Sequence, residues 1–190
     1  STSRSQHEDL TVRDEFPETM LFEPEVEADE RGRASVELEL PDSITTWRVQ
    51  AQAHTSAGRF GEGTLRLPVT KPFFVEVDLP SHLTSGDRVT VPITIVDERE
   101  SRDSPLNTTI ALETTGALAL VGSSRKNVSI RPGEQPRKVL GVTLRASGHD
   151  EGTLTVRGTA SSGKNDYRDG VRRKTTVLPN GRKLEKTAAD

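Results

Sequence analysis

The sequence predicts an all-β protein of antiparallel sandwiches of about immunoglobulin size, and three observations support this fold class. Apolar and polar residues alternate with a period of two along most of the chain, which is typical of strands with one buried face. Turn signals such as SAGR, TSGD and SSGKND interrupt this alternation at short intervals. The hydrophobic content of 31% and the aromatic content of 4% favour thin cores over one thick core.

Alternation locates the strands in chain order. The first part of the chain has segments at 34–40 and 46–53, and the Gly-x-Gly of 60–67 opens a further strand. The sequence TKP at 70–72 indicates a junction. Pro92 interrupts a regular segment and predicts an edge position or a bulge there. The segments after the junction are 73–79, 88–97, 110–112, 128–130, 140–144, 154–156 and 171–177.

The stretch LPDSITTWRVQAQAH at 40–54 joins a turn to one strand. Pro41 and Asp42 start the turn, and the side chains of Asp42 and Ser43 are expected to hydrogen-bond their own backbone. The register places Trp47, the only tryptophan of the chain, on the apolar face. A strand tryptophan in a sandwich usually belongs to a core, so Trp47 is predicted to be buried and not part of a binding site.

Composition excludes several classes of partner and chemistry. The absence of cysteine excludes disulfides, thiol nucleophiles and cysteine-ligated metals. No run of 18 apolar residues occurs, so no direct membrane insertion is expected. Residues 1–100 hold 10 basic and 20 acidic side chains, and residues 101–190 hold 16 and 9. The basic residues are scattered and Tyr167 is the only aromatic among them, so no nucleic-acid partner is expected.

No catalytic, cofactor-binding or metal-binding residue is predicted, and the chain is not expected to be an enzyme. It lacks a nucleophile elbow, a phosphate-binding loop and a dinucleotide fingerprint. The segment NDYRDG at 165–170 resembles a calcium loop, but Tyr167 and Thr176 stand where ligands belong. The acidic run 23–30 is better explained as a solvated strand face and turn. The four histidines are dispersed and lack zinc-ligand spacing: His7, His54, His82 and His149.

Two Asn-x-Ser/Thr sequons occur, at Asn107 and Asn127. They would be glycosylated only in a eukaryotic secretory pathway, and we interpret them as chance occurrences.

Three blocks of sequence carry a family resemblance over nearly the whole chain. They are FPET at 16–19 with PDSITTW at 41–47, then KPFFVEVDLPSHL at 71–83, and finally DGVRRKTTVLPNGRKLEKT at 169–187. In this order they resemble the α2-macroglobulin and complement family, in the part that follows the bait region. In its lack of cysteine, the sequence resembles bacterial members of the family more than vertebrate ones. The Cys-Gly-Glu-Gln thioester of the family and its histidine are not in this sequence.

The resemblance implies two immunoglobulin/fibronectin-III-like antiparallel β-sandwich (macroglobulin) domains, the first incomplete. Residues 1–15 would be the end of the bait region and a flexible segment that leads into the first domain. Residues 16–70 would be the post-bait part of one macroglobulin domain, with four or five strand segments. Residues 71–178 would form a complete, seven-stranded macroglobulin sandwich. Residues 179–190 would link to a CUB-like, thioester-bearing region.

The function that the resemblance implies is mechanical. The chain would be a framework fragment of a broad-spectrum protease inhibitor, relaying bait cleavage to rearrangement of the trap in an extracytoplasmic parent protein. Its partners would be neighbouring macroglobulin and thioester domains, target proteases indirectly, and a second copy through the incomplete first domain. The alternative is a stand-alone adhesion or ligand-binding sandwich, which would need an exposed aromatic platform.

Overall fold

The computed structural model describes residues 12–181, in which all regular secondary structure is β-strand. The prediction of an all-β fold is therefore confirmed. The chain divides into two compact units, one formed by Arg13–Lys71 and the other by the residues from Pro72 onward together with Val12. Each unit is described below by itself.

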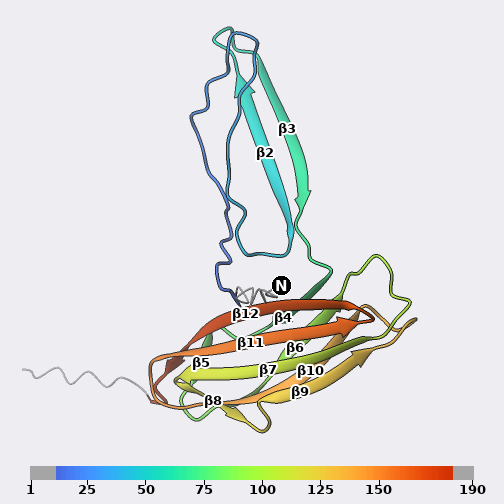
Figure 1. Ribbon diagram of the computed structural model, residues 1–190. Coiled ribbons are helices and arrows are strands. Elements are labelled where there is room, and N and C mark those ends of the chain that lie inside the picture. Colours follow the sequence, from blue (N-terminus) through green and yellow to red (C-terminus); the bar gives the residue numbers. More distant parts are fainter. Residues whose placement is uncertain (1–11, 182–190) are drawn as a thin grey trace, which may run out of the picture. The chain divides into compact units, whose positions relative to one another are not determined.

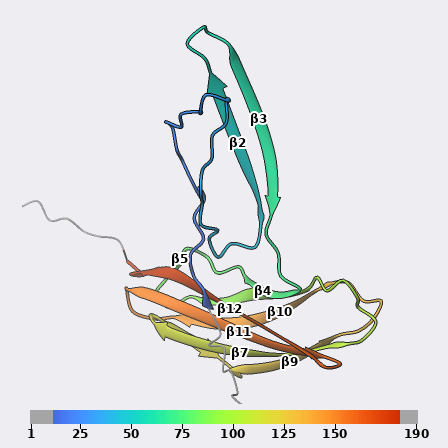
Figure 2. The same cartoon turned by 45° about the horizontal axis from the view of Figure 1, so that its top comes forward.

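The unit from Pro72 onward is a sandwich of two sheets (Figures 1 and 2). One sheet has the order β1-β12-β11-β7-β9, with β5 parallel to β12, and the other has the order β4-β6-β10-β8. The strands are β1 (Val12–Arg13), β4 (Phe73–Val77), β5 (His82–Thr84), β6 (Arg88–Asp97), β7 (Leu106–Gly116), β8 (Leu118–Val121), β9 (Arg125–Ile130), β10 (Arg137–Ala146), β11 (Glu151–Ser162) and β12 (Asn165–Leu178).

The core lies between these two sheets. Ile93 and Ile95 of β6 are fully buried, as are Ile110 of β7 and Leu154 of β11. One glycine allows the sheets to approach: a Cβ on Gly158 would lie 2.9 Å from Cζ of Phe73 and 3.0 Å from Cγ1 of Val75. A larger residue at 158 would push β4 away from β11, because packed interiors leave no room for extra atoms.

The sandwich has nine strands between Phe73 and Leu178, and the predicted count of seven was wrong. The two short strands β5 and β8 account for the difference. The chain passes from β7 in one sheet to β8 in the other at Gly116, whose φ of 66° favours glycine. A bend of this kind lets one run of residues contribute to both sheets, which alternation alone does not reveal.

Two further details of the sandwich differ from the sequence prediction. Phe74, expected on a solvated face, is 2% exposed and pairs across the strands with buried Val96. Pro92 lies in the central strand β6, opposite Gly141 of β10, and not at an edge. The Asp78 N–H donates to the Pro92 carbonyl beyond the end of β4. The proline nitrogen points to the same side of β6 as this carbonyl, toward Asp78, where β4 has already ended, so the missing N–H interrupts no pair of the β4–β6 ladder.

The unit Arg13–Lys71 is built on one hairpin. Strand β2 (Thr46–His54) pairs with β3 (Phe60–Pro68), with Trp47 opposite Leu67. The five-residue connection closes through the Thr55 N–H, which donates to the Arg59 carbonyl at 2.9 Å. Alternation found β2 because its apolar and polar residues take opposite faces.

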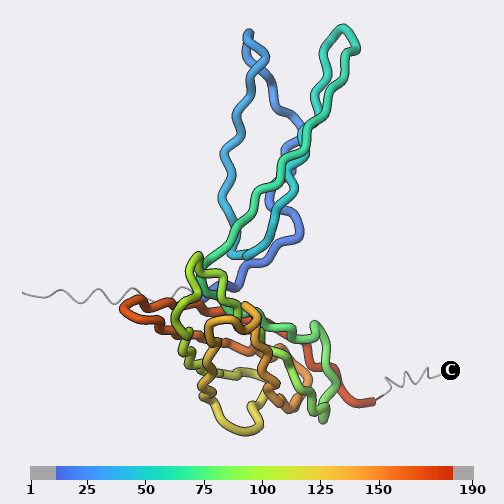
Figure 3. Tube along the Cα trace, turned by 90° about the vertical axis from the view of Figure 1, so that its right-hand side faces the viewer, coloured from blue at the N-terminus to red at the C-terminus, as the bar shows by residue number. Residues whose placement is uncertain are grey.

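Residues 14–45 form no strand; they loop out to a turn at Asp29–Arg33 and return beside the hairpin (Figure 3). The Asp29 carboxylate holds this turn by accepting the N–H groups of Arg31 and Arg33 at 2.9 and 2.8 Å. The strand predicted at 34–40 is absent, and this region has two strands where four or five were predicted. Alternation marks a sequence able to form a strand, but a strand also needs a partner for its backbone groups.

Candidate functional site

The Asp42 junction, formed by residues 13–16 and 42, fixes the start of the first unit. The Asp42 carboxylate accepts the Asp14 N–H at 3.1 Å and the Glu15 N–H at 3.4 Å. The buried Arg13 donates to the Asp42 carbonyl at 3.5 Å, and its guanidinium lies 5.9 Å from the Phe16 ring centre. The prediction that Asp42 bonds its own local backbone was wrong, because its partners lie 27 and 28 residues earlier.

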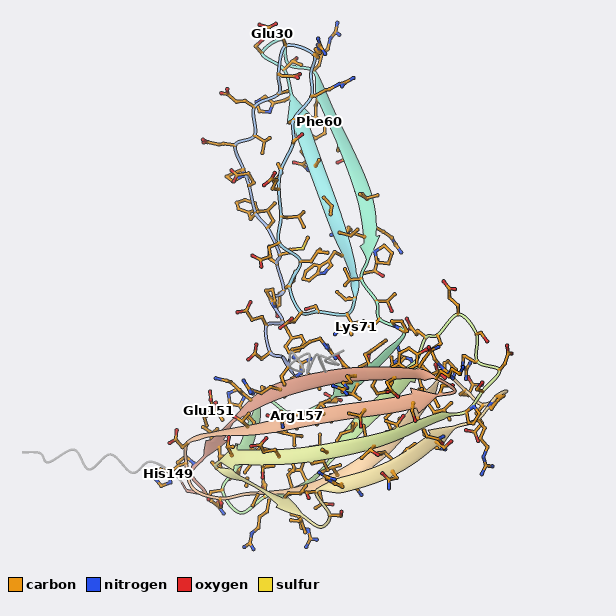
Figure 4. All side chains as sticks on the ribbon, viewed as in Figure 1. Glu30, Phe60, Lys71, His149, Glu151 and Arg157 are labelled. Carbon is orange, nitrogen blue, oxygen red and sulfur yellow. The ribbon has the colours of Figure 1, made fainter. Side chains whose placement is uncertain are left out.

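Trp47 is half-buried, so its prediction as a core residue was too strong. None of residues 14–71 is buried, which leaves the tryptophan without a closed core around it in this unit. Several large apolar side chains of the unit are exposed: Phe22 by 82%, Phe60 by 66% and Leu65 by 63%. Phe60 begins β3 at the tip of the hairpin (Figure 4). The hairpin thus presents apolar surface that an isolated domain would normally cover.

An ion pair closes one end of the sandwich core. The Arg99 Nε and Nη2 donate to the two oxygens of Asp97 at 2.7 and 2.9 Å, and the two side chains are 7% and 1% exposed. Arg99 also donates to Ser162 Oγ of β11 and, at 3.0 Å, to the Ser104 carbonyl. This bidentate pair ties β6 to the opposite sheet and to the loop before β7. The sequence signal was Asp97 itself, which occupies an inward position after Ile93 and Ile95.

The charges of this pair stabilise each other. Burial by itself raises the pKa of the Asp97 carboxyl, but the hydrogen bonds and charge of Arg99, with the charge of Arg102, outweigh it. The pKa of Asp97 therefore lies below its usual value. The hydrogen bond to Asp97 is the main cause that raises the pKa of Arg99, and Tyr167 raises it further. The pair is structural, because its polar atoms are used by one another and by Ser104 and Ser162.

The two sequons lie side by side on the outer face of the six-stranded sheet. Strand β7 places Asn107 opposite Ser129 of β9, and Thr109 opposite Asn127. The Thr109 hydroxyl donates to Asn127 Oδ1 at 2.9 Å. Each asparagine therefore stands opposite the hydroxyl residue of the other sequon, so the two motifs form one polar cluster across two strands.

The other sequence candidates do not come together. His54 ends β2, His82 lies in β5 beside Ser81 Oγ, and His149 precedes β11 (Figure 4), while His7 lies outside the described residues. The NDYRDG segment belongs to β12, where Asp166 is exposed and Asp169 is buried and accepts the Val75 N–H at 3.0 Å. The two carboxylates take opposite faces of the strand and cannot share an ion. Among residues 12–181 no group of three or more potential metal ligands occurs.

The same described residues hold no helix long and apolar enough to cross a membrane.

Comparison with known proteins identifies the family. The model of the Alpha-2-macroglobulin family matches residues 19–109. The alpha-2-macroglobulin of Escherichia coli is 32% identical over 163 residues, which cover 83% of this chain and 9% of that protein. An alpha-2-macroglobulin homolog of Deinococcus radiodurans is 28% identical over 92% of this chain and 16% of its own length.

Solved structures agree with this assignment. Trypsin-activated alpha-2-macroglobulin from E. coli superposes with a TM-score of 0.67 at 30% identity, over 80% of this chain and 10% of that chain. The native conformation of the same protein gives a TM-score of 0.54 over 80% of this chain and 9% of that chain. The chain thus spans a small part of the length of the relatives that it matches. On the sequence match over most of its length and on its fold, the chain belongs to the alpha-2-macroglobulin family.

Proposed function

We propose that this chain is a framework segment of an alpha-2-macroglobulin-type protease inhibitor. Residues 16–70 would be the post-bait part of one macroglobulin domain, residues 71–178 the next macroglobulin domain, and residues 179–190 the link to a thioester-bearing region. Residues 1–15 would end the bait region. The parent protein would act outside the cytoplasm, with neighbouring macroglobulin and thioester domains as direct partners and proteases as indirect ones.

The observation that carries this proposal is a contrast within the first unit: hydrogen bonds hold its first residues in place, but none of its side chains forms a buried core. The Asp42 junction holds residues 13–16 next to the turn that starts β2. Yet no side chain of residues 14–71 is buried, and Val36, Leu38 and Leu40 are each 38% to 49% exposed. This exposed apolar surface supports the proposal that the segment is part of a larger domain. Another segment of the parent protein, or a second copy, would cover the surface.

The same arrangement supports a relay role. If a protease cuts the chain before residue 13, tension on that end is released where Arg13, Asp14 and Glu15 bind Asp42. The change would pass from the turn to β2, through β3, and to the sandwich by way of Thr70–Pro72. The sandwich would then move as one body, because its packed interior shifts between discrete arrangements and does not deform continuously.

A trapping assay on the full-length parent protein tests the proposal. A trapped protease should keep its activity on a small peptide substrate and lose it on a large protein substrate. A flexible Gly-Ser insertion between Thr70 and Lys71 should leave bait cleavage unchanged on a denaturing gel while restoring cleavage of the large substrate, because a flexible linker transmits no rigid-body shift.

The matched control places the same insertion at Gly163, in the exposed turn between β11 and β12. This variant should trap like the wild type. Unimpaired trapping by the Thr70 insertion, or equal loss in both variants, would contradict a relay through this connection. A parent protein that leaves the large substrate fully accessible would contradict the inhibitor function itself.

The alternative of a stand-alone binding module has less support. The half-buried Tyr167 is the only aromatic residue of the sandwich after Phe74, so the expected aromatic platform is missing. In the trapping assay this alternative predicts no protection of the protease at all.

A further inference from the structure

We propose that the outer face of the six-stranded sheet carries a binding site for a neutral carbohydrate. The site is a cavity of about 690 Å³ over one end of β9, β7, β11 and β12. This volume lies in the range of sites for small organic ligands and far above that needed for a single ion. The proposal concerns the sandwich alone and does not depend on the relay proposed above.

The strand registers arrange eight of the lining residues in two rows across four strands. Ser129, Asn107, Ser161 and Asp166 are opposite one another in the first row. Asn127, Thr109, Thr159 and Arg168 follow in the second row. All eight line the cavity. Because strands are spaced about 4.8 Å apart, each row spans about 14 Å, which suits an extended ligand.

The side chains of the two rows match the chemistry of sugar hydroxyl groups. Serine, threonine and asparagine each offer both a donor and an acceptor, as a hydroxyl group does. The Thr109 hydroxyl already donates to Asn127 Oδ1, which fixes the orientation of that amide and leaves its NH₂ group directed elsewhere. Six of the eight residues are uncharged and polar, so an apolar ligand would leave their hydrogen bonds unmet.

The charge of the site favours a neutral ligand. Asp166 contributes one carboxylate and Arg168 one guanidinium, both from β12. An anionic ligand would meet the carboxylate, and a cationic ligand would meet the guanidinium, whereas a neutral sugar can hydrogen-bond to both. The planar carboxylate and guanidinium groups, beside the hydroxyl side chains, can make directional hydrogen bonds to a sugar while the net charge of the site stays low.

Contacts on the buried side of the sheet also hold the site in place. Ser161 precedes Ser162, whose Oγ accepts from Arg99, and Arg99 is held by Asp97. The sheet end that carries the first row is therefore fixed by a buried ion pair, which lowers the cost of ordering the site on binding. Tyr167 is the only aromatic residue of the lining and it interacts with Arg99, so we expect weak affinity, on the order of millimolar.

The test is an NMR titration of the 190-residue chain with a panel of neutral and anionic saccharides, each raised above the expected dissociation constant. We expect a neutral oligosaccharide to shift the backbone and side-chain amide signals of Asn107, Asn127 and Thr159. Thr159→Val, which replaces a hydroxyl with a methyl group, should weaken binding at least about fivefold, in line with the loss of one hydrogen bond in a small set.

The control is Thr115→Val, the same change on the same face of the sheet but outside the two rows. It should leave the affinity unchanged, and both variants should keep the wild-type amide spectrum away from the substitution. Binding by anionic saccharides alone would overturn the neutral-ligand proposal. Absence of shifts with every saccharide, shifts away from the cavity, or equal weakening by the two variants would overturn the site.

Discussion

The two units of this chain have similar strand sequences but opposite degrees of completion. The sandwich unit buries 23 apolar residues, all from Phe73 onward, whereas residues 14–71 bury none. Both regions show the two-residue alternation, as in Val91, Ile93 and Ile95 of β6 and in Trp47 and Val49 of β2. The difference lies in whether a second sheet covers the apolar face.

The comparison teaches that alternation and burial are separate properties. Leu65 alternates as regularly as Leu154, yet it is 63% exposed while Leu154 is fully buried. Burial of apolar area supplies most of the folding free energy, at about 25 cal/mol per Å². The hairpin unit therefore relies on its backbone ladder and on the Asp42 junction, and we expect it to be the less stable of the two.

The most direct test of this comparison is one substitution made in both units. Leu154→Ala should lower the free energy of unfolding of the sandwich by about 2–5 kcal/mol, because it leaves a cavity in a packed core. Leu65→Ala should change stability by less than about 0.5 kcal/mol, as is usual for exposed positions. Denaturant unfolding followed by far-UV circular dichroism measures the first effect. Trp47 fluorescence reports on the hairpin unit, since no other tryptophan occurs. Equal effects of the two substitutions would contradict the comparison.

The second prediction concerns the ion pair that closes the sandwich. Asp97→Asn should destabilise the protein at pH 7 by about 3–5 kcal/mol, because Arg99 then stays buried without its counter-charge. The folded pKa of Asp97 is depressed, so its contribution is present above the unfolded value near 4 and is lost as pH falls through the lower folded value. The stability difference between wild type and variant should therefore shrink as pH drops below about 4.

Unfolding curves at a series of pH values measure this difference. Asp103→Asn, in the same loop and exposed, serves as the control and should remain close to wild type at every pH. A difference for Asp97→Asn that stays constant from pH 7 to acid would mean that the pair does not contribute as an ionised bond.

The sequence predicted the strands of the sandwich better than their partners. Alternation placed β4, β6, β10 and β12 because each has a buried face. It did not find the buried pair of Asp97 and Arg99, since that contact depends on how the chain turns after β6. It also could not find the polar cavity, because the rows of Asn107 and Asn127 exist only once β7 pairs with β9 and β11. The strand at 34–40 failed for the related reason that its backbone forms no ladder with another strand.

The third prediction concerns Trp47, whose environment lies between the two extremes. Trp47→Ala should destabilise the hairpin by about 1–2 kcal/mol, below the 3–5 kcal/mol of a fully buried aromatic, because the ring is only half-buried. Hydrogen exchange of the β2 and β3 amides measures the local effect. Arg48→Ala, on the exposed face of the same strand, is the control and should leave exchange nearly unchanged. A loss as large as that of Leu154→Ala would show that Trp47 belongs to a closed core.

The smallest expected effect is weak self-association of the chain through the hairpin unit. Among residues 12–181, β2 and β3 pair only with each other, so each has one unpaired edge beside exposed apolar side chains. Light scattering should show the average mass rising with concentration in the wild type. Leu65→Lys should abolish the rise, because a lysine beside the edge opposes strand pairing and reduces apolar surface. Val139→Lys makes a similar change at a side chain 61% exposed on β10 of the sandwich, outside the hairpin, and should leave the rise intact. A chain that stays monomeric at all concentrations, or association lost equally in both variants, would show that the hairpin is not the contact.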